Sequence, residues 1–234
     1  MNLILLFDED FVGEATVRLN GRRLEHVAQV HRAAVGDELA VGALNGKTGR
    51  GVVTRLDAEA LEMRVTLDGD PPPPRRVTLA LALPRPKVLN RVVASATSLG
   101  VKRIFLINAW RVEKSYWKSP RLSDENLMLQ RVLGLEQARD TVLPRIELRR
   151  LFRPFIEEEL PSIAKGTRAL VAHPHATVEC PRGVDEEVTL AIGPEGGFIA
   201  EEIASLERAG FTPVSMGPRI LRVETAVAAL LGRL

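Results

Sequence analysis

The chain of 234 residues has a single cysteine, Cys180, and aromatic residues make up only 4% of it. One cysteine excludes an internal disulfide and any metal cluster built from several cysteines. No apolar run approaches the ~20 residues that a membrane-spanning helix needs. The apolar start at 1–7 has no basic segment and is followed at once by Asp8-Glu9-Asp10, unlike a secretory signal. We therefore expect a cytoplasmic protein without a metal ion and without a membrane partner.

The chain also lacks a strong excess of one charge, because its formal net charge is only +2. That charge is unevenly spread. Residues 1–70 hold 8 Lys and Arg against 12 Asp and Glu, residues 71–150 hold 16 against 6, and residues 151–234 hold 8 against 12. A basic middle between two mildly acidic flanks suits contact with a phosphate backbone. A solvated, Arg-rich face explains the same pattern equally well.

Residues 1–70 are predicted to be β-rich, with a short helix at 24–30. The Asn45-Gly46 pair is typical of a hairpin turn. Strands are expected at 2–7, 38–41, 51–55 and 61–67. Four consecutive prolines, Pro71–Pro74, can neither continue a helix nor pair in a central strand. We therefore place a domain at 1–70, a stiff linker at 71–75 and a second domain at 76–234.

The second domain alternates strands and helices, which predicts an α/β domain with an open, largely parallel sheet. Its strands are expected at 77–83, 103–107, 168–172, 188–192 and 213–216. A helix that begins at Ser123 carries Glu136 on its apolar face. A half-buried carboxylate needs a partner, so Glu136 is interpreted as a structural hydrogen-bonding residue in preference to one that lines a site.

Two of these strands run into Gly-Pro turns. The strand at 188–192 is followed by Gly193-Pro194-Glu195-Gly196-Gly197, and the strand at 213–216 by Gly217-Pro218. Ligands bind outside the carboxyl ends of the strands in parallel α/β sheets, and glycines let a ligand approach the backbone. The pattern predicts a ligand site at these turns, although two ordinary strand–helix turns remain the alternative.

The segments IGPEGGF (192–198) and MGPRILRVETA (216–226) together resemble the RsmE family. Its members are S-adenosyl-L-methionine-dependent methyltransferases of the SPOUT class that methylate N3 of a uridine in 16S ribosomal RNA. The resemblance implies a C-terminal SPOUT trefoil-knot methyltransferase domain after an N-terminal PUA-like β-barrel. It also implies S-adenosyl-L-methionine as cofactor and 16S rRNA within the small ribosomal subunit as partner.

A homodimer is a further implication of the resemblance, since SPOUT enzymes pair through the knotted region. Residues 226–231 are all apolar. A surface helix normally shows polar residues on one side, so this closing helix is expected to be covered all round. Burial within the chain's own core is the alternative to a dimer.

The resemblance also implies the roles of individual residues. Arg222 is expected to stabilise negative charge on a uridine carbonyl, and Glu224 to accept the N3 proton or to orient Arg222. A simple ion pair between them at the helix start is the alternative. Cofactor binding is expected of Ala172, His173, Ile192, Gly193, Pro194, Glu195, Gly196, Gly197, Met216, Gly217, Arg219, Ile220 and Leu221. The candidates for RNA contact are Arg22, Arg23, Arg32, Lys47 and Arg50, and for each of them a solvated surface position is the alternative.

The chain departs from the family pattern outside the two cofactor motifs. Ser95 and Ser98 stand where the family has Lys and Glu, and Arg139-Asp140 where it has Gly-Arg. These departures bear on RNA positioning more than on cofactor binding. Two other functions stay open: a SPOUT methyltransferase that acts on another RNA, and a non-catalytic RNA-binding module. A Rossmann dehydrogenase is disfavoured, because no Gly-x-Gly-x-x-Gly follows the first strands.

Overall fold

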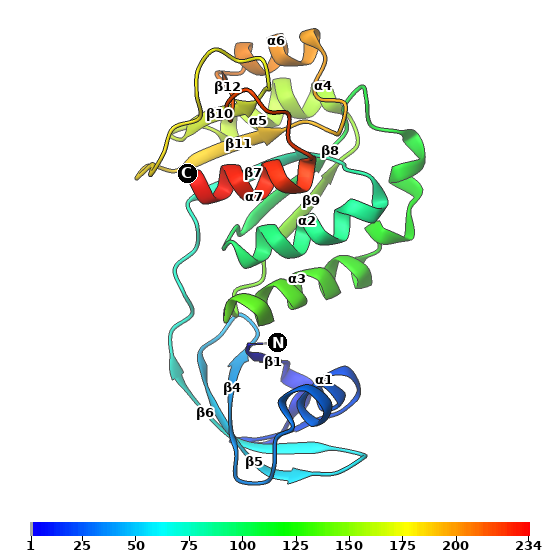
Figure 1. The fold of residues 1–234 in the computed structure, drawn as a ribbon, viewed down its shortest axis with the longest axis vertical. Helices are drawn as coiled ribbons and strands as arrows, with labels where there is room; N and C mark the ends of the chain where they lie inside the picture. Colours follow the sequence, from blue (N-terminus) through cyan, green and yellow to red (C-terminus); the bar gives the residue numbers. More distant parts are fainter. Residues whose placement is uncertain (1) are drawn as a thin grey trace. The chain divides into compact units, whose positions relative to one another are not determined.

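The computed structural model describes residues 2–234 and divides the chain into two compact units (Figure 1). The first unit extends to Pro73 and includes Val132–Leu143, and the second contains Pro74–Arg131 and Pro144–Leu234. The chain therefore leaves the first unit inside the run of four prolines. The inclusion of 132–143 in the first unit had no counterpart in the sequence analysis.

The first unit is built on a six-stranded sheet with the order β1-β4-β5-β6-β3-β2. The strands are β1 (Ile4–Leu6), β2 (Phe11–Gly13), β3 (Thr16–Leu19), β4 (Glu38–Ala43), β5 (Thr48–Leu56) and β6 (Leu61–Gly69). Only the β1–β4 pair is parallel among the described pairs. The hairpin turn expected at Asn45-Gly46 is confirmed, since Asn45 has a φ of 56° between β4 and β5. The sequence analysis missed β2 and β3, which are short and packed around a tight turn.

A helical segment follows β3 in the first unit. It consists of α1 (Gly21–His26) and a π-helical turn, η2 (Val27–His31), and it ends at Arg32 in the left-handed region. Arg23 donates two hydrogen bonds to the buried Asp10 and a third to the carbonyl of Leu5. Removing one partner of such a buried pair costs roughly 3–5 kcal/mol. Arg23 therefore holds α1 against the start of the sheet.

Glu136 has the structural role that its place on the helix predicted. Its side chain is 1% exposed and accepts two hydrogen bonds from Arg22, of 2.8 and 3.1 Å. Its backbone carbonyl accepts the N–H groups of Asn2 and Leu3, both at 3.0 Å. All these residues belong to the first unit, so Glu136 ties the segment 132–143 to the sheet.

The second unit is an α/β fold around a six-stranded sheet with the order β12-β10-β11-β7-β8-β9. The strands are β7 (Val77–Ala82), β8 (Arg103–Ile107), β9 (Arg145–Arg149), β10 (Arg168–Ala172), β11 (Val188–Ile192) and β12 (Thr212–Val214). Every described pair is parallel, which confirms the expected parallel sheet. All the carboxyl ends therefore lie along one edge.

Helices cover both faces of this sheet. They are α2 (Pro86–Ser98), α4 (Phe152–Pro154), α5 (Leu160–Ile163), α6 (Ala200–Arg208) and α7 (Val223–Arg233). The helix α3 (Asp124–Ala138) begins in the second unit and ends in the segment 132–143, which belongs to the first. Short helical turns of this unit lie at η3 (Lys114–Lys118), η4 (Pro120–Leu122) and η5 (Phe155–Glu159), and η1 (Asp8–Asp10) lies in the first unit. Figure 1 shows α2 beside α7 on one side of the sheet and α4, α5 and α6 grouped on the other. The chain thus returns from the edge strand β12 to α7, next to the helix that follows β7.

The local sequence explains where these helices begin and end. Pro86 occupies the first turn of α2, where it fits because no N–H is needed. Leu89, Val92 and Val93 fall on the buried face of α2. The carboxylate of Glu202 accepts the N–H of Ile199 at the start of α6. Among the helices that the structure describes, none has the length and apolar character to cross a membrane.

Candidate active site

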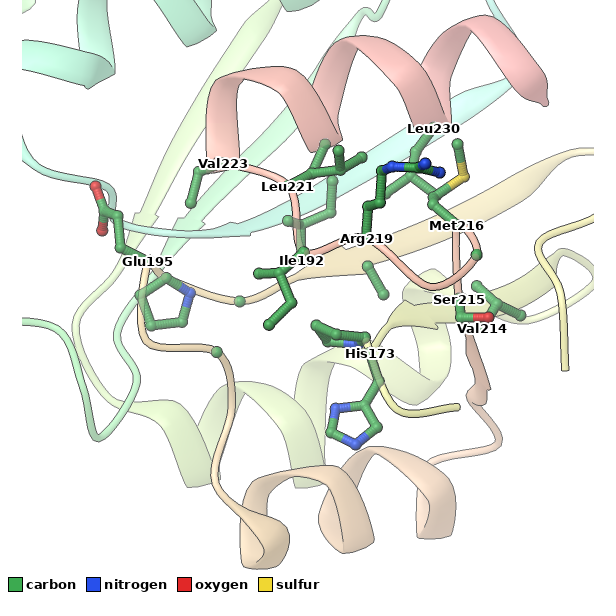
Figure 2. Close-up of a pocket in the computed structure, with 18 residues that line it drawn as sticks. His173, Ile192, Glu195, Val214, Ser215, Met216, Arg219, Leu221, Val223 and Leu230 are labelled. Atoms are coloured by element: carbon green, nitrogen blue, oxygen red, sulfur yellow. The ribbon is translucent and has the colours of Figure 1, made fainter. Parts of the chain in front are cut away.

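A pocket lies where three strands of the second unit end (Figure 2). Its walls are Ala172–Pro174 after β10, residues 192–197 without Gly196 after β11, and residues 214–221 without Pro218 after β12. Val223, Ala226 and Leu230 of α7 complete the lining. The space between these walls measures about 650 Å³ when the open solvent at its mouth is included. Figure 2 shows Leu221 and Leu230 beside α7 and His173 on the opposite side.

The structure brings together all but one of the residues named for the cofactor. The exception is Gly196, which does not line the pocket. Its carbonyl accepts a hydrogen bond from Arg111, and a Cβ added at Gly196 would lie 2.8 Å from Cδ of Arg111. The close approach that the sequence assigned to a ligand at Gly196 is therefore made by Arg111.

Gly193 and Gly217 are two of the positions where the turns require glycine, and Gly197, with a φ of 72°, is another. A Cβ at Gly193 would lie 2.9 Å from the backbone nitrogen of Phe198, because the turn folds tightly back on itself. Gly217 has a φ of 91°, a conformation that residues with a Cβ rarely adopt. Both turns therefore present bare backbone to the pocket.

The backbone of Met216–Leu221 is the most open part of the lining. Within the part of the chain that the structure describes, its N–H and C=O groups make no hydrogen bond with other protein groups. Backbone polar groups normally find a partner in the fold or in solvent. A short wall of unpaired donors and acceptors beside apolar side chains fits a flat heterocycle with a polar edge.

The polar side chains that line the pocket are those of His173, Glu195, Ser215 and Arg219. Glu195 accepts the backbone N–H of Arg85 at 3.0 Å, so its carboxylate is already engaged. The backbone N–H of His173 donates to the carbonyl of Val214 at 2.9 Å. Partial burial is the main cause that lowers the pKa of His173 below its ordinary value, and the nearby His175 lowers it further. This shift favours the neutral form of the His173 imidazole.

Arg222 and Glu224 do not line the pocket, although Leu221 and Val223 next to them do. Arg222 is exposed, and no hydrogen bond or ion pair joins its side chain to the described residues. Glu224 is 3.5 Å from Arg91 of α2, so the structure pairs it with Arg91 and not with Arg222. The catalytic roles of Arg222 and Glu224 stay predictions.

The RNA-contact candidates of the first unit differ in their surroundings. The Arg23 side chain is only 14% exposed and is committed to Asp10, which argues against an RNA contact. Arg22 is bound to Glu136. Arg32 and Lys47 are exposed, and Arg50 has only a distant carboxylate, Glu38 at 3.9 Å. Arg32, Lys47 and Arg50 remain candidates.

One surface feature near the pocket was missed by the sequence analysis. The segment 108–122 follows β8 and contains Trp110, Tyr116 and Trp117 among four Lys and Arg residues. Trp110 is 78% exposed. The signal was present in the sequence, because aromatic residues interleaved with basic ones are typical of nucleic-acid-binding segments. The sequence analysis counted the charges of residues 71–150 together and therefore did not consider this segment separately.

Across residues 2–234, no group of three or more His, Cys, Asp or Glu side chains is placed to hold a metal ion. Cys180 is buried, and burial raises the pKa of its thiol. A buried, protonated thiol is a poor nucleophile. The pocket at the strand ends therefore remains the candidate site.

The chain is similar to known proteins along most of its length. Residues 71–234 match the family described as RNA methyltransferase domain. The ribosomal RNA small subunit methyltransferase E of Mycobacterium bovis is 30% identical over 216 residues, which cover 88% of this chain and 81% of that protein. The protein of the same name from Treponema pallidum is 29% identical over 238 residues, covering 98% and 88%.

Among solved structures, a ribosomal RNA small subunit methyltransferase E from Neisseria gonorrhoeae, bound to S-adenosyl methionine, has a similar fold. It aligns with a TM-score of 0.76 at 21% sequence identity and covers 99% of this chain and 95% of that one. The likeness extends through both units of the chain.

Proposed function

We propose that this chain, which belongs to the ribosomal RNA small subunit methyltransferase E family, methylates ribosomal RNA of the small ribosomal subunit with S-adenosylmethionine. The observation that carries the proposal is the pocket at the strand ends, with its unpaired backbone groups at Met216–Leu221. The relatives named for this activity span nearly the whole chain. The specific acceptor is N3 of a uridine in 16S rRNA, and the reaction takes place in the cytoplasm.

The second unit is proposed to be a SPOUT trefoil-knot domain and the first a PUA-like RNA-binding barrel. The path of the chain supports the knot. After β12, at the edge of the sheet, residues 215–222 run back past the ends of β10 and β11 to α7, which lies against α2 (Figure 1). In such a knot, the turns that line the pocket belong to the knotted part of the chain.

The pocket residues fit S-adenosylmethionine. The apolar side chains of Ile192, Leu221 and Leu230 provide surfaces for the adenine ring, and the unpaired backbone groups of 216–221 can bond to its polar edge. S-adenosylmethionine supplies an electrophilic methyl group on a positively charged sulfur. The chain's own residues must then position the uridine and remove its proton.

Uridine N3 lies in the base-pairing edge, so the base must be unpaired to reach the site. Arg222 can donate hydrogen bonds to a carbonyl next to N3, where negative charge develops as the proton leaves. Glu224 accepts that proton. Arg91, 3.5 Å away, holds the Glu224 carboxylate, so Arg222 stays available for the substrate.

The proposed function is tested by RNA mass spectrometry. Small subunits from a bacterial strain without its own ribosomal RNA small subunit methyltransferase E are incubated with the purified chain and S-adenosylmethionine. We expect one N3-methyluridine in 16S rRNA that is absent without enzyme. Methylation of a different RNA would mean that the chain is an RNA methyltransferase with another substrate. The absence of methylation on any RNA would overturn the proposal.

A homodimer is the proposed assembly, and α7 supports it. Val227, Leu230 and Leu231 are buried within the chain, whereas Ala228 is exposed. The helix that the sequence predicted to be covered all round therefore has an exposed stretch with small side chains. Small side chains allow a second helix to pack closely, and a two-fold contact is the commonest arrangement.

Ala228→Arg is expected to convert the dimer into a monomer, because the new charge would be buried without a partner in the interface. Sedimentation equilibrium of the wild type should give twice the 25.7 kDa of the chain, and the variant should give the single-chain mass. Thr225→Arg, at another exposed position of α7, maps how far the interface extends. A wild-type monomer that still methylates RNA would contradict the dimer.

A further inference from the structure

Trp110 is the most exposed of the large hydrophobic residues that the structure describes, at 78%. An exposed indole does not contribute the free energy of stabilisation that its burial would provide. It therefore points to a partner that covers the ring in the working complex. Trp110 lies just beyond β8, at the edge of the sheet where the candidate pocket opens.

The backbone at Trp110 is held firmly although its side chain is free. Its N–H donates to one carboxylate oxygen of Glu202 at 2.7 Å. The other oxygen of Glu202 accepts the N–H of Ile199 at 3.0 Å, and the Glu202 side chain is buried. One carboxylate thus joins the Trp110 segment to the start of α6, just after the turn that forms a wall of the pocket.

The residue after Trp110 makes a second connection to that turn. Arg111 donates to the carbonyl of Gly196, between Glu195 and Gly197, which both line the pocket. Two independent contacts, through Glu202 and through Arg111, therefore hold Trp110 at the rim of the site. The Trp110 side chain can contact a substrate from this position, although it does not line the pocket itself.

The charged residues near Trp110 indicate which kind of partner would bind there. Lys114, Lys118 and Arg121 of the same segment are exposed, and none of them forms an ion pair with the described residues. The only acid of the segment, Glu113, accepts the hydroxyl of Tyr116 at 3.1 Å. Free cations beside an exposed indole favour a nucleic-acid strand, whose phosphates bind the cations while its bases stack on the ring.

We propose that Trp110 is a stacking platform for an unpaired base of the RNA substrate, with Lys114, Lys118 and Arg121 as contacts to its phosphates. The inference rests on the proposed RNA methylation and adds a substrate-positioning residue to it. Stacking holds the strand at the rim of the pocket, where the target uridine can enter. Trp110 takes no part in the chemical step itself.

Trp110→Ala is expected to raise the KM for small ribosomal subunits by roughly tenfold or more, since each stacked base contributes about 1–3 kcal/mol. Affinity for S-adenosylmethionine and kcat should change little. Trp110→Phe keeps a flat ring and should recover most of the lost affinity. Leu151→Ala is the matched control, because Leu151 is another exposed apolar residue, at 67%, outside the segment 108–122.

Fluorescence gives a direct readout, because the chain has only two tryptophans. In the Trp117→Phe variant all indole emission comes from Trp110. Adding purified 16S rRNA without ribosomal proteins should quench this emission, as expected for a ring covered by a base. Cofactor binding by the variant checks that it is folded, since Trp117 donates to Asn108 at 2.9 Å.

The outcomes separate this inference from the proposed function. A wild-type KM in Trp110→Ala, with normal methylation, overturns the stacking role alone. A raised KM without quenching by naked RNA assigns Trp110 to a ribosomal protein and also overturns it. If the wild-type chain methylates no RNA, the proposed function fails, while quenching by RNA still supports the contact.

Discussion

Arg222→Ala is expected to lower the rate of rRNA methylation by about 100-fold, as for other lost transition-state donors, while affinity for S-adenosylmethionine stays unchanged. Arg222 is exposed beside two pocket-lining residues, and its side chain has no partner in the described part of the chain. Removing it should therefore cost the fold little. Calorimetry measures cofactor binding, and methyl incorporation into small subunits measures the rate.

The control is Arg208→Ala, which removes another exposed arginine. Arg208 lies on α6, and its side chain donates to Ser205 at 2.8 Å and to no other of the described residues, so this variant should methylate at close to the wild-type rate. Equal losses of cofactor affinity and rate in Arg222→Ala would mean that Arg222 shapes the pocket and does not act on the uridine.

Gly193→Val is expected to weaken S-adenosylmethionine binding by about 100-fold, near the top of the roughly 1–3 kcal/mol cost of overpacking. The first added carbon would lie 2.9 Å from the nitrogen of Phe198 and 3.2 Å from the carbonyl carbon of Gly197. Both are backbone atoms, so the turn must shift as a whole. That turn forms one wall of the pocket, and calorimetry reports the loss.

Gly232→Ala is the control for this substitution. A Cβ there meets nothing within 4 Å, and the glycine lies at the end of α7, outside the pocket lining. Its cofactor affinity should match that of the wild type. Unchanged affinity in Gly193→Val, with thermal unfolding as evidence that the chain is folded, would remove the 193–197 turn from the cofactor site.

The central strands of the second unit were readable from the sequence because they are buried on both faces. Strands in that position are continuous apolar runs, and β8, β10 and β11 fall at the predicted residues. The strand β9 was missed although it reads Arg-Ile-Glu-Leu-Arg. This alternation of polar and apolar residues is typical of a half-buried strand, which suits its place at the edge of the sheet.

The pocket could be predicted from the sequence for a different reason. Its turns are local, and Gly and Pro mark them directly in the sequence. Pairings between distant residues leave no such mark. Glu224 meets Arg91 across 133 residues, and Trp110 meets Glu202 across 92, so tertiary packing alone decides both. For the same reason the partners of Arg22 and Arg23 could not be derived from the sequence.

The wall from Met216 to Leu221 has an evolutionary consequence. Its unpaired N–H and C=O groups belong to the main chain, and all residues carry them except proline, which lacks the N–H. Recognition through such groups is largely independent of which side chains stand there. Mutations can therefore accumulate around the pocket without loss of the ligand, provided that the path of the backbone is kept. A site of this construction can persist between proteins that share only 30% of their residues.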